Sequence, residues 1–208
     1  MLIKKVKEVN SQSGFSLIEM LISMVVSLLV LAAGISAFST ALSMRAREAS
    51  KTDAVTSTQA ALNVMTREIG NAGFGLTTNG IVLPDSNNKR LRFRSNLYNN
   101  DNATSAPGED ILFSFDTTSG SVVRFDANAP TVAPVGVVNR ISDVEFGYCD
   151  YSGSTSFPCD TTPSADTCRI EITLTVFLPD VVGQPSGQTA TVKSDVTLRN
   201  APYMRGQY

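Results

Sequence analysis

A long uncharged apolar segment lies near the start of the chain. No ionisable residue occurs from Met20 to Met44. Its 25 residues would form a helix of roughly 37 Å at about 1.5 Å per residue, which crosses a hydrocarbon core of about 30 Å with some tilt. The pattern therefore predicts a membrane-spanning helix.

The helical pattern continues beyond this segment. No proline occurs between Phe15 and Ile69, so a single helix of 55 residues, about 82 Å long, is predicted. Its second half is amphipathic, and we expect the apolar stripe to pack against a sheet. The stripe follows spacings of three and four at Val55, Thr58, Leu62, Met65 and Ile69. Three glycines are expected to end the helix, at Gly70, Gly73 and Gly75.

Short runs rich in Val, Ile, Phe and Thr follow, separated by glycine, asparagine and proline. This texture predicts an antiparallel sheet. The turn-rich segments Asp116–Gly120 and Gly183–Gly187 predict hairpin connections, and the polar segment Asn96–Gly108 predicts an exposed loop. The predicted strands are Ile81–Leu83, Leu91–Arg94, Asp110–Phe115, Ser121–Phe125, Val132–Val138, Ile141–Tyr148, Arg169–Leu178 and Thr189–Arg199.

One acidic residue stands at the mouth of the apolar run. Glu19 follows Gly14-Phe15-Ser16-Leu17-Ile18, and an unpaired carboxylate in a bilayer costs roughly 2.5–3.5 kcal/mol. The preceding leader, Met1 to Gly14, is short and basic, and we expect it to stay on the cytoplasmic side. A cut after Gly14 would create an amino group near Glu19, which is mostly cationic at neutral pH with a reference pKa of about 7.7–8. Such a group could neutralise the carboxylate within lipid.

Residues 14–19 and the apolar run resemble the processing motif of type IV prepilins and pseudopilins. The resemblance implies that a prepilin peptidase cuts after Gly14 and methylates Phe15. It also implies that Glu19 meets the terminal amine of a neighbouring subunit during filament assembly. Two further segments resemble PilW-like minor pilins: Arg67-Glu68-Ile69-Gly70-Asn71-Ala72-Gly73-Phe74, and the terminal Val196-Thr197-Leu198-Arg199-Asn200. Many family members carry a proline near Ser36, and this chain does not.

The resemblance implies an α+β type IV pilin fold, with a long N-terminal helix packed on an antiparallel β-sheet domain. Residues 1–14 would be a cleaved basic leader, and residues 15–44 the transmembrane and assembly half of the helix. Residues 45–75 would be its amphipathic half and end, and residues 76–208 a β-rich domain in the periplasm or outside the cell. The implied partners are the prepilin peptidase, other major and minor pilins and the inner-membrane assembly platform. The protein would lie in the inner membrane before assembly and in a surface pilus afterwards.

Three functions remain open. The first is a minor pilin of a type IV pilus, with roles in priming assembly, adhesion, motility or DNA uptake. The second is a minor pseudopilin of a type II secretion system, and the third is a membrane-anchored periplasmic binding domain. A secretory signal peptide is disfavoured because its apolar stretch is about 7–15 residues, and a simple anchor with Glu19 at the interface leaves Gly14-Phe15 unexplained.

Composition offers little catalytic chemistry. The 208-residue chain has no histidine, which excludes Ser-His-Asp and Cys-His systems within it, and it contains no Gly-rich phosphate loop. We therefore expect neither an enzyme nor a cofactor or metal site. Removal of residues 1–14 changes the side-chain charge from −2 to −4. Nucleic-acid binding is therefore not expected, although Arg90, Arg92 and Arg94 would share one face of a strand, interpreted as a solvated face. The adjacent acids Glu109 and Asp110 are interpreted as solvated turn residues.

Three cysteines lie in the domain expected to face an oxidising compartment, which predicts one disulfide and one free thiol. We expect Cys149 to pair with Cys168, because these two flank the loop between predicted adjacent strands. Cys159 would then be free at the loop tip. The spacing of the thiols, without histidine, is a poor match to structural zinc.

Overall fold

The computed structural model describes residues 14–98, 103–131, 133–150, 159–180 and 185–205. The chain divides into two compact units, Met1–Ala46 and Arg47–Tyr208. Val132 and the first half of the predicted Gly183–Gly187 hairpin lie outside the described residues.

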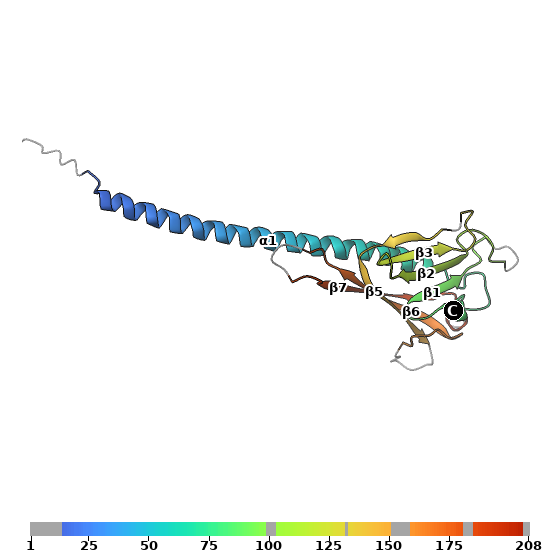
Figure 1. Ribbon diagram of the computed structural model, residues 1–208. Helices are drawn as coiled ribbons and strands as arrows, with labels where there is room; N and C mark the ends of the chain where they lie inside the picture. The colour runs from blue at the N-terminus through green and yellow to red at the C-terminus, as the bar shows by residue number, and fades with distance from the viewer. Residues whose placement is uncertain (1–13, 99–102, 132, 151–158, 181–184, 206–208) are drawn as a thin grey trace, which may run out of the picture. The chain divides into compact units, whose positions relative to one another are not determined.

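The N-terminal helix is continuous. Helix α1 spans Leu17–Ile69, 53 residues, and so begins two residues after the predicted start (Figure 1). The apolar stripe of its second half is confirmed: Thr58, Leu62, Met65 and Ile69 are buried, and Val55 is half-buried. These residues lie in the second unit, where burial of apolar surface holds the helix against the sheets.

Two antiparallel sheets complete the second unit (Figure 1). The first has the order β1-β2-β3-β4 and the second β5-β6-β7. The strands are β1 (Arg90–Arg94), β2 (Asp110–Asp116), β3 (Ser121–Asp126), β4 (Val135–Val138), β5 (Ile141–Asp150), β6 (Thr167–Phe177) and β7 (Thr189–Thr197). A 3-10 turn, η1 (Leu83–Asp85), and a short helix, α2 (Pro202–Arg205), lie outside the sheets.

The predicted strand Ile81–Leu83 is wrong. Ile81 forms only an isolated bridge with Phe93, and Leu83 already belongs to η1. Pro84 explains the difference, because its fixed φ suits the start of a tight helical turn and it has no N–H for a ladder. The predicted Val132–Val138 strand is likewise shorter, since β4 begins after Pro134.

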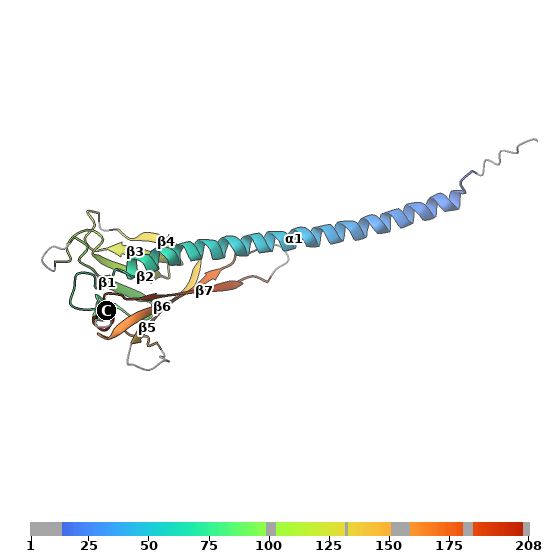
Figure 2. The same ribbon diagram turned by 180° about the vertical axis from the view of Figure 1, so that it is seen from behind.

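The hydrophobic core lies between the two sheets and the second half of α1. Figures 1 and 2 show this part of the helix beside strands of both sheets. In β1 and β6 alternate residues are buried, as period-two patterning requires. The largest fully buried side chains are Tyr148, Phe93, Phe113 and Phe146.

The chain turns back sharply after α1. Gly73 has a φ of +73°, and its N–H donates to the carbonyl of Arg94 at 2.9 Å. A Cβ on Gly80 would lie 2.1 Å from the backbone nitrogen of Gly73. Only glycine permits this approach and this φ without strain, so the sequence of the turn fixes where β1 starts relative to the helix end.

Candidate functional site: the N-terminal segment and the start of the helix

Glu19 lies in the first turn of α1. Gly14, Phe15 and Ser16 precede the helix, and the carbonyl of Ser16 accepts hydrogen bonds from the N–H groups of Glu19 at 3.0 Å and Met20 at 3.2 Å. A carboxylate at this position is favoured by the partial positive charge of the helix N-terminus. The backbone carbonyl of Ser16 therefore closes the first turn of the helix.

The Glu19 carboxylate has no ion-pair partner among residues 14–98, 103–131, 133–150, 159–180 and 185–205. Its backbone carbonyl accepts a hydrogen bond from the Ser23 hydroxyl at 2.7 Å. The side chain therefore stands as an exposed negative charge at the start of an apolar helix.

The apolar side chains of this segment are uncovered. Every large hydrophobic side chain from Phe15 to Met44 is at least 50% exposed, and Leu17 reaches 81%. By length and composition, α1 also meets the requirements of a membrane span. A continuous apolar surface of this extent indicates lipid or other protein chains as its surroundings.

The fold does not require glycine at position 14. A Cβ built on Gly14 would meet no atom within 4 Å, and the same holds for Gly34 in the middle of the apolar run. The small size of Gly14 therefore has no explanation in the packing of the described residues.

As predicted, Arg90, Arg92 and Arg94 share one face of β1. This face is not simply solvated, which corrects that part of the prediction. Arg92 binds Asp110 through two parallel hydrogen bonds, Nε to Oδ1 at 2.7 Å and Nη2 to Oδ2 at 2.9 Å. Its Nη1 also donates to Asp85 at 2.6 Å, and the Arg94 Nε donates to Asp110 at 2.8 Å. The hydrogen bond to Asp110 is the main cause of a raised pKa of Arg92. Local carboxylates thus satisfy most of the charge that could have attracted a phosphate backbone.

Glu109 and Asp110 are not solvated turn residues, which corrects the prediction. Glu109 is 1% exposed, and its carboxylate accepts the backbone N–H groups of Tyr98 at 3.0 Å and Ala106 at 2.9 Å. Burial alone would raise the pKa of Asp110, but the hydrogen bonds from Arg92 and Arg94 outweigh burial and lower it. The two acids therefore organise the segment before β2. The donors to Glu109 come from the loop before β2, and those to Asp110 come from the neighbouring strand β1. Both sets depend on how the chain folds, which the adjacent acids in the sequence do not show.

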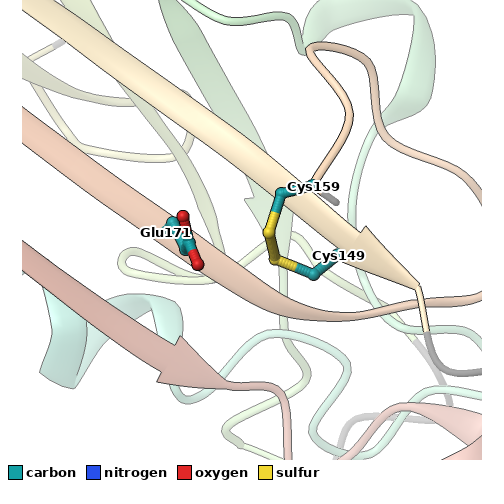
Figure 3. Close-up of side chains that lie close together, drawn as sticks. All are labelled: Cys149, Cys159 and Glu171. Atoms are coloured by element: carbon teal, nitrogen blue, oxygen red, sulfur yellow. A yellow bond between two sulfur atoms is a disulfide. The ribbon is translucent and has the colours of Figure 1, made fainter. Parts of the chain in front are cut away.

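The disulfide prediction is wrong. Cys149 pairs with Cys159, with Cα atoms 4.2 Å apart, and Cys168 is a buried free thiol (Figure 3). The reason is the alternation of side chains: Cys168 packs in the main core cluster, whereas Cys149 lies opposite Arg169, on the other face of the sheet, where it is also buried. Cys149 and Cys168 lie on neighbouring strands, but their side chains are on opposite faces of the sheet.

Glu171 lies beside this disulfide on the outer face (Figure 3). Its carboxylate and the sulfur atoms of Cys149 and Cys159 lie within 4.8 Å of one another. The two sulfurs are bonded to each other, and Glu171 is paired with Arg169 at 3.3 Å. In this oxidised state the group offers no thiolate to a metal ion.

The segments 67–74 and 196–200 meet in the fold. The Asn200 side-chain amide donates to the carbonyl of Ala72 at 3.3 Å, and Glu68 accepts a hydrogen bond from Arg124 of β3 at 2.8 Å. Ile69 and Leu198 are fully buried. Many of these residues therefore have a structural role in closing the helix end onto the sheets.

The N-terminal segment is similar to a known protein family. Residues 9–35 match the family model of the prokaryotic N-terminal methylation motif. The chain carries this methylation motif. The long apolar helix and the antiparallel sheets behind it give the α+β arrangement that was expected from the resemblance to type IV pilins.

Curated proteins and solved structures were compared with the chain as a whole. No curated protein matches it, so the resemblance to PilW-like minor pilins stays a prediction. A solved structure that it resembles is a type IV-like pilin from Thermus thermophilus, with 14% sequence identity and a TM-score of 0.44. The match covers 70% of this chain and 97% of that one.

Within the methylation motif, residues 9–35 include Gly14, Phe15 and Glu19. The match therefore spans the end of the predicted leader, the start of α1 and most of the apolar run. It ends well before the β-sheet unit, which begins at Arg47.

Proposed function

We propose that this protein is a minor pilin of a type IV pilus. A prepilin peptidase would cut it after Gly14 and methylate Phe15, and residues 15–44 would hold it in the inner membrane until it enters the filament. Residues 45–75 would lead out of the membrane into the β-rich domain, residues 76–208. The observation that carries the proposal is the unpaired Glu19 at the start of an uncovered apolar helix that bears the methylation motif.

The electrostatics of Glu19 support assembly as the role of this segment. An isolated carboxylate near lipid costs roughly 2.5–3.5 kcal/mol, and the amino group of a neighbouring subunit offsets this cost when the two meet. This ion pair forms only when a second subunit docks. The Glu19 carboxylate would therefore disfavour insertion of a single subunit into the membrane and favour assembly of two subunits. Helix-to-helix contact in the filament would also cover the exposed apolar side chains.

Processing explains Gly14 better than folding does. A side chain at this position would meet nothing within 4 Å in the described structure, so the glycine serves recognition by another protein. We assign that protein as the prepilin peptidase. The domain beyond α1 would then act as a structural, non-enzymatic module that contacts other pilins.

The first prediction concerns Glu19. Glu19→Ala should still be processed and inserted, because the change lowers the cost of placing the helix in lipid. Its incorporation into sheared filaments should fall by about 60-fold or more, because the lost charge pair offsets an insertion penalty of about 2.5–3.5 kcal/mol and each 1.4 kcal/mol corresponds to about tenfold. Immunoblots of membrane and filament fractions measure both.

Thr40→Ala is the matched control for this experiment. Thr40 lies on the same exposed apolar helix, and its hydroxyl donates to the carbonyl of Ser36 within that helix at 3.0 Å. This variant should assemble like the wild type. Normal incorporation of Glu19→Ala would refute the charge-pairing role.

A deletion strain distinguishes a pilus from a secretion pseudopilus. Loss of surface pili with intact protein secretion supports the minor pilin. Intact pili with defective secretion would instead assign the chain to a type II secretion system.

A further inference from the structure

Strand β7 has one unpaired edge. It is the last strand of its sheet and pairs only with β6, and among the described residues no other segment forms a backbone hydrogen bond with it. The N–H of Leu198 donates to the carbonyl of Cys168, and the N–H of Leu178 donates to the carbonyl of Gln188. Hydrogen-bonded and non-hydrogen-bonded pairs alternate in an antiparallel ladder, so the even-numbered residues of β7 are the ones that bond to β6.

The odd positions of β7 consequently direct their N–H and C=O groups to the open edge. These positions include Thr191, Asp195 and Thr197, whose side chains are also exposed. Such an edge can accept an extended segment of another chain by strand addition.

The end of helix α1 forms a groove with one part of this edge. The groove has a volume of about 460 Å³ and lies within the second unit. Its lining comprises Thr66, Arg67, Gly70 and Asn71 from the helix end and Asp195, Val196, Thr197 and Arg199 from β7 and the following residues. A Cβ on Gly70 would lie 3.7 Å from Val196 Cγ2. The helix and the strand therefore approach within side-chain contact distance at the floor of the groove.

The groove carries two arginines without acidic partners. Arg67 and Arg199 are exposed, and neither forms an ion pair with any residue that the structure describes. Arg92 and Arg124, by contrast, are held by carboxylates. Asp195 is the acid among the groove's lining residues, so the lining has a net positive charge in a protein of net negative charge.

We propose that this groove binds an extended, carboxylate-bearing segment of a partner protein. The segment's backbone would pair with β7 at Asp195 and Thr197, and Arg67 and Arg199 would hold its carboxylate. A strand edge supplies affinity through main-chain hydrogen bonds, and the two charges supply selectivity for an acidic sequence. This inference does not depend on the chain being a pilus subunit.

Peptide binding to the full chain in detergent micelles tests the inference. The probe is a short labelled peptide of alternating valine and threonine that ends in aspartate with a free carboxylate. The comparison peptide ends in asparagine amide. We expect saturable binding of the acidic probe by fluorescence anisotropy, and about two- to five-fold weaker binding after Arg67→Gln or Arg199→Gln. Asp195→Asn should strengthen binding, because it removes the acid that repels the probe.

Two proline variants test the strand pairing. Thr197→Pro removes an outward N–H inside the groove and leaves the bonds to β6 in place, so it should abolish binding. Thr191→Pro makes the same change on the same edge outside the groove lining and should leave binding unchanged. Circular dichroism of both variants checks that they fold.

Three results would overturn the proposal. One is the absence of saturable binding to the wild type, and another is equal affinity for the acidic and amide peptides. The third is undiminished binding to a folded Thr197→Pro variant.

Discussion

At the scale of single residues, the direction of a side chain decides the chemistry of the cysteines. Cys168 packs in the core with its thiol directed to the carbonyl of Cys149 at 3.6 Å. Burial raises the pKa of the Cys168 thiol, so little of the reactive thiolate is present at neutral pH. Cys149, on the opposite face, is free to meet Cys159 above the sheet.

This arrangement predicts how the cysteine variants behave. Cys149→Ser and Cys159→Ser should each lower the free energy of unfolding by about 2–3 kcal/mol, because each opens the same loop. The double variant should cost no more than either single one, since both remove one bond. Denaturant unfolding measures all three.

Peptide mapping of the unreduced protein provides the companion observation. The native protein should yield a peptide that joins Cys149 to Cys159, and Cys168 should be alkylated only after denaturation. A peptide joining Cys149 to Cys168 would contradict the assignment.

At the scale of elements, a set of ion pairs joins β1 to β2 and η1. Asp110 receives hydrogen bonds from both Arg92 and Arg94, and Arg92 also reaches Asp85. The Asp110 carboxylate is 7% exposed, which limits screening by solvent. The arginines of the strand face therefore stabilise the fold.

The lowered pKa of Asp110 gives this network a pH dependence. A depressed folded-state pKa stabilises the fold above the unfolded value of about 3.9, and the contribution is lost as pH falls through the folded pKa. Wild type should be more stable than Asp110→Asn at pH 7, and the difference should shrink below about pH 4. Urea unfolding across this range measures it, and a constant difference would exclude the linkage.

The sequence predicted elements whose signal is local. The stripe from Thr58 to Ile69 and the alternation of Ile170 and Ile172 each repeat along one segment, so helix α1 and strand β6 followed directly from the sequence. The burial of Glu109 was not predictable in this way, because its donors come from a segment that folds back over it. The predicted disulfide was wrong for a related reason: the face of the sheet on which each cysteine lies decides the pairing, and separation along the chain does not show that face.

At the scale of the whole molecule, the chain combines a pilin-like N-terminal segment with a sheet unit. Gly14, Phe15 and Glu19 could be picked out from sequence because their motif is continuous, and residues 9–35 match the methylation motif. The groove beside β7 could not be predicted from the sequence, because Arg67 and Arg199 line one groove only when the helix end meets the last strand. The N-terminal segment would serve filament assembly, and the groove at the sheet edge would serve recognition of a partner protein.

The mass of the mature N-terminal peptide tests the central claim most directly. Protein from the membrane fraction should begin at Phe15 and carry one added methyl group, and Gly14→Ala should retain the leader. An unprocessed Met1 terminus, or a cut within the apolar run near Ala37, would contradict the account.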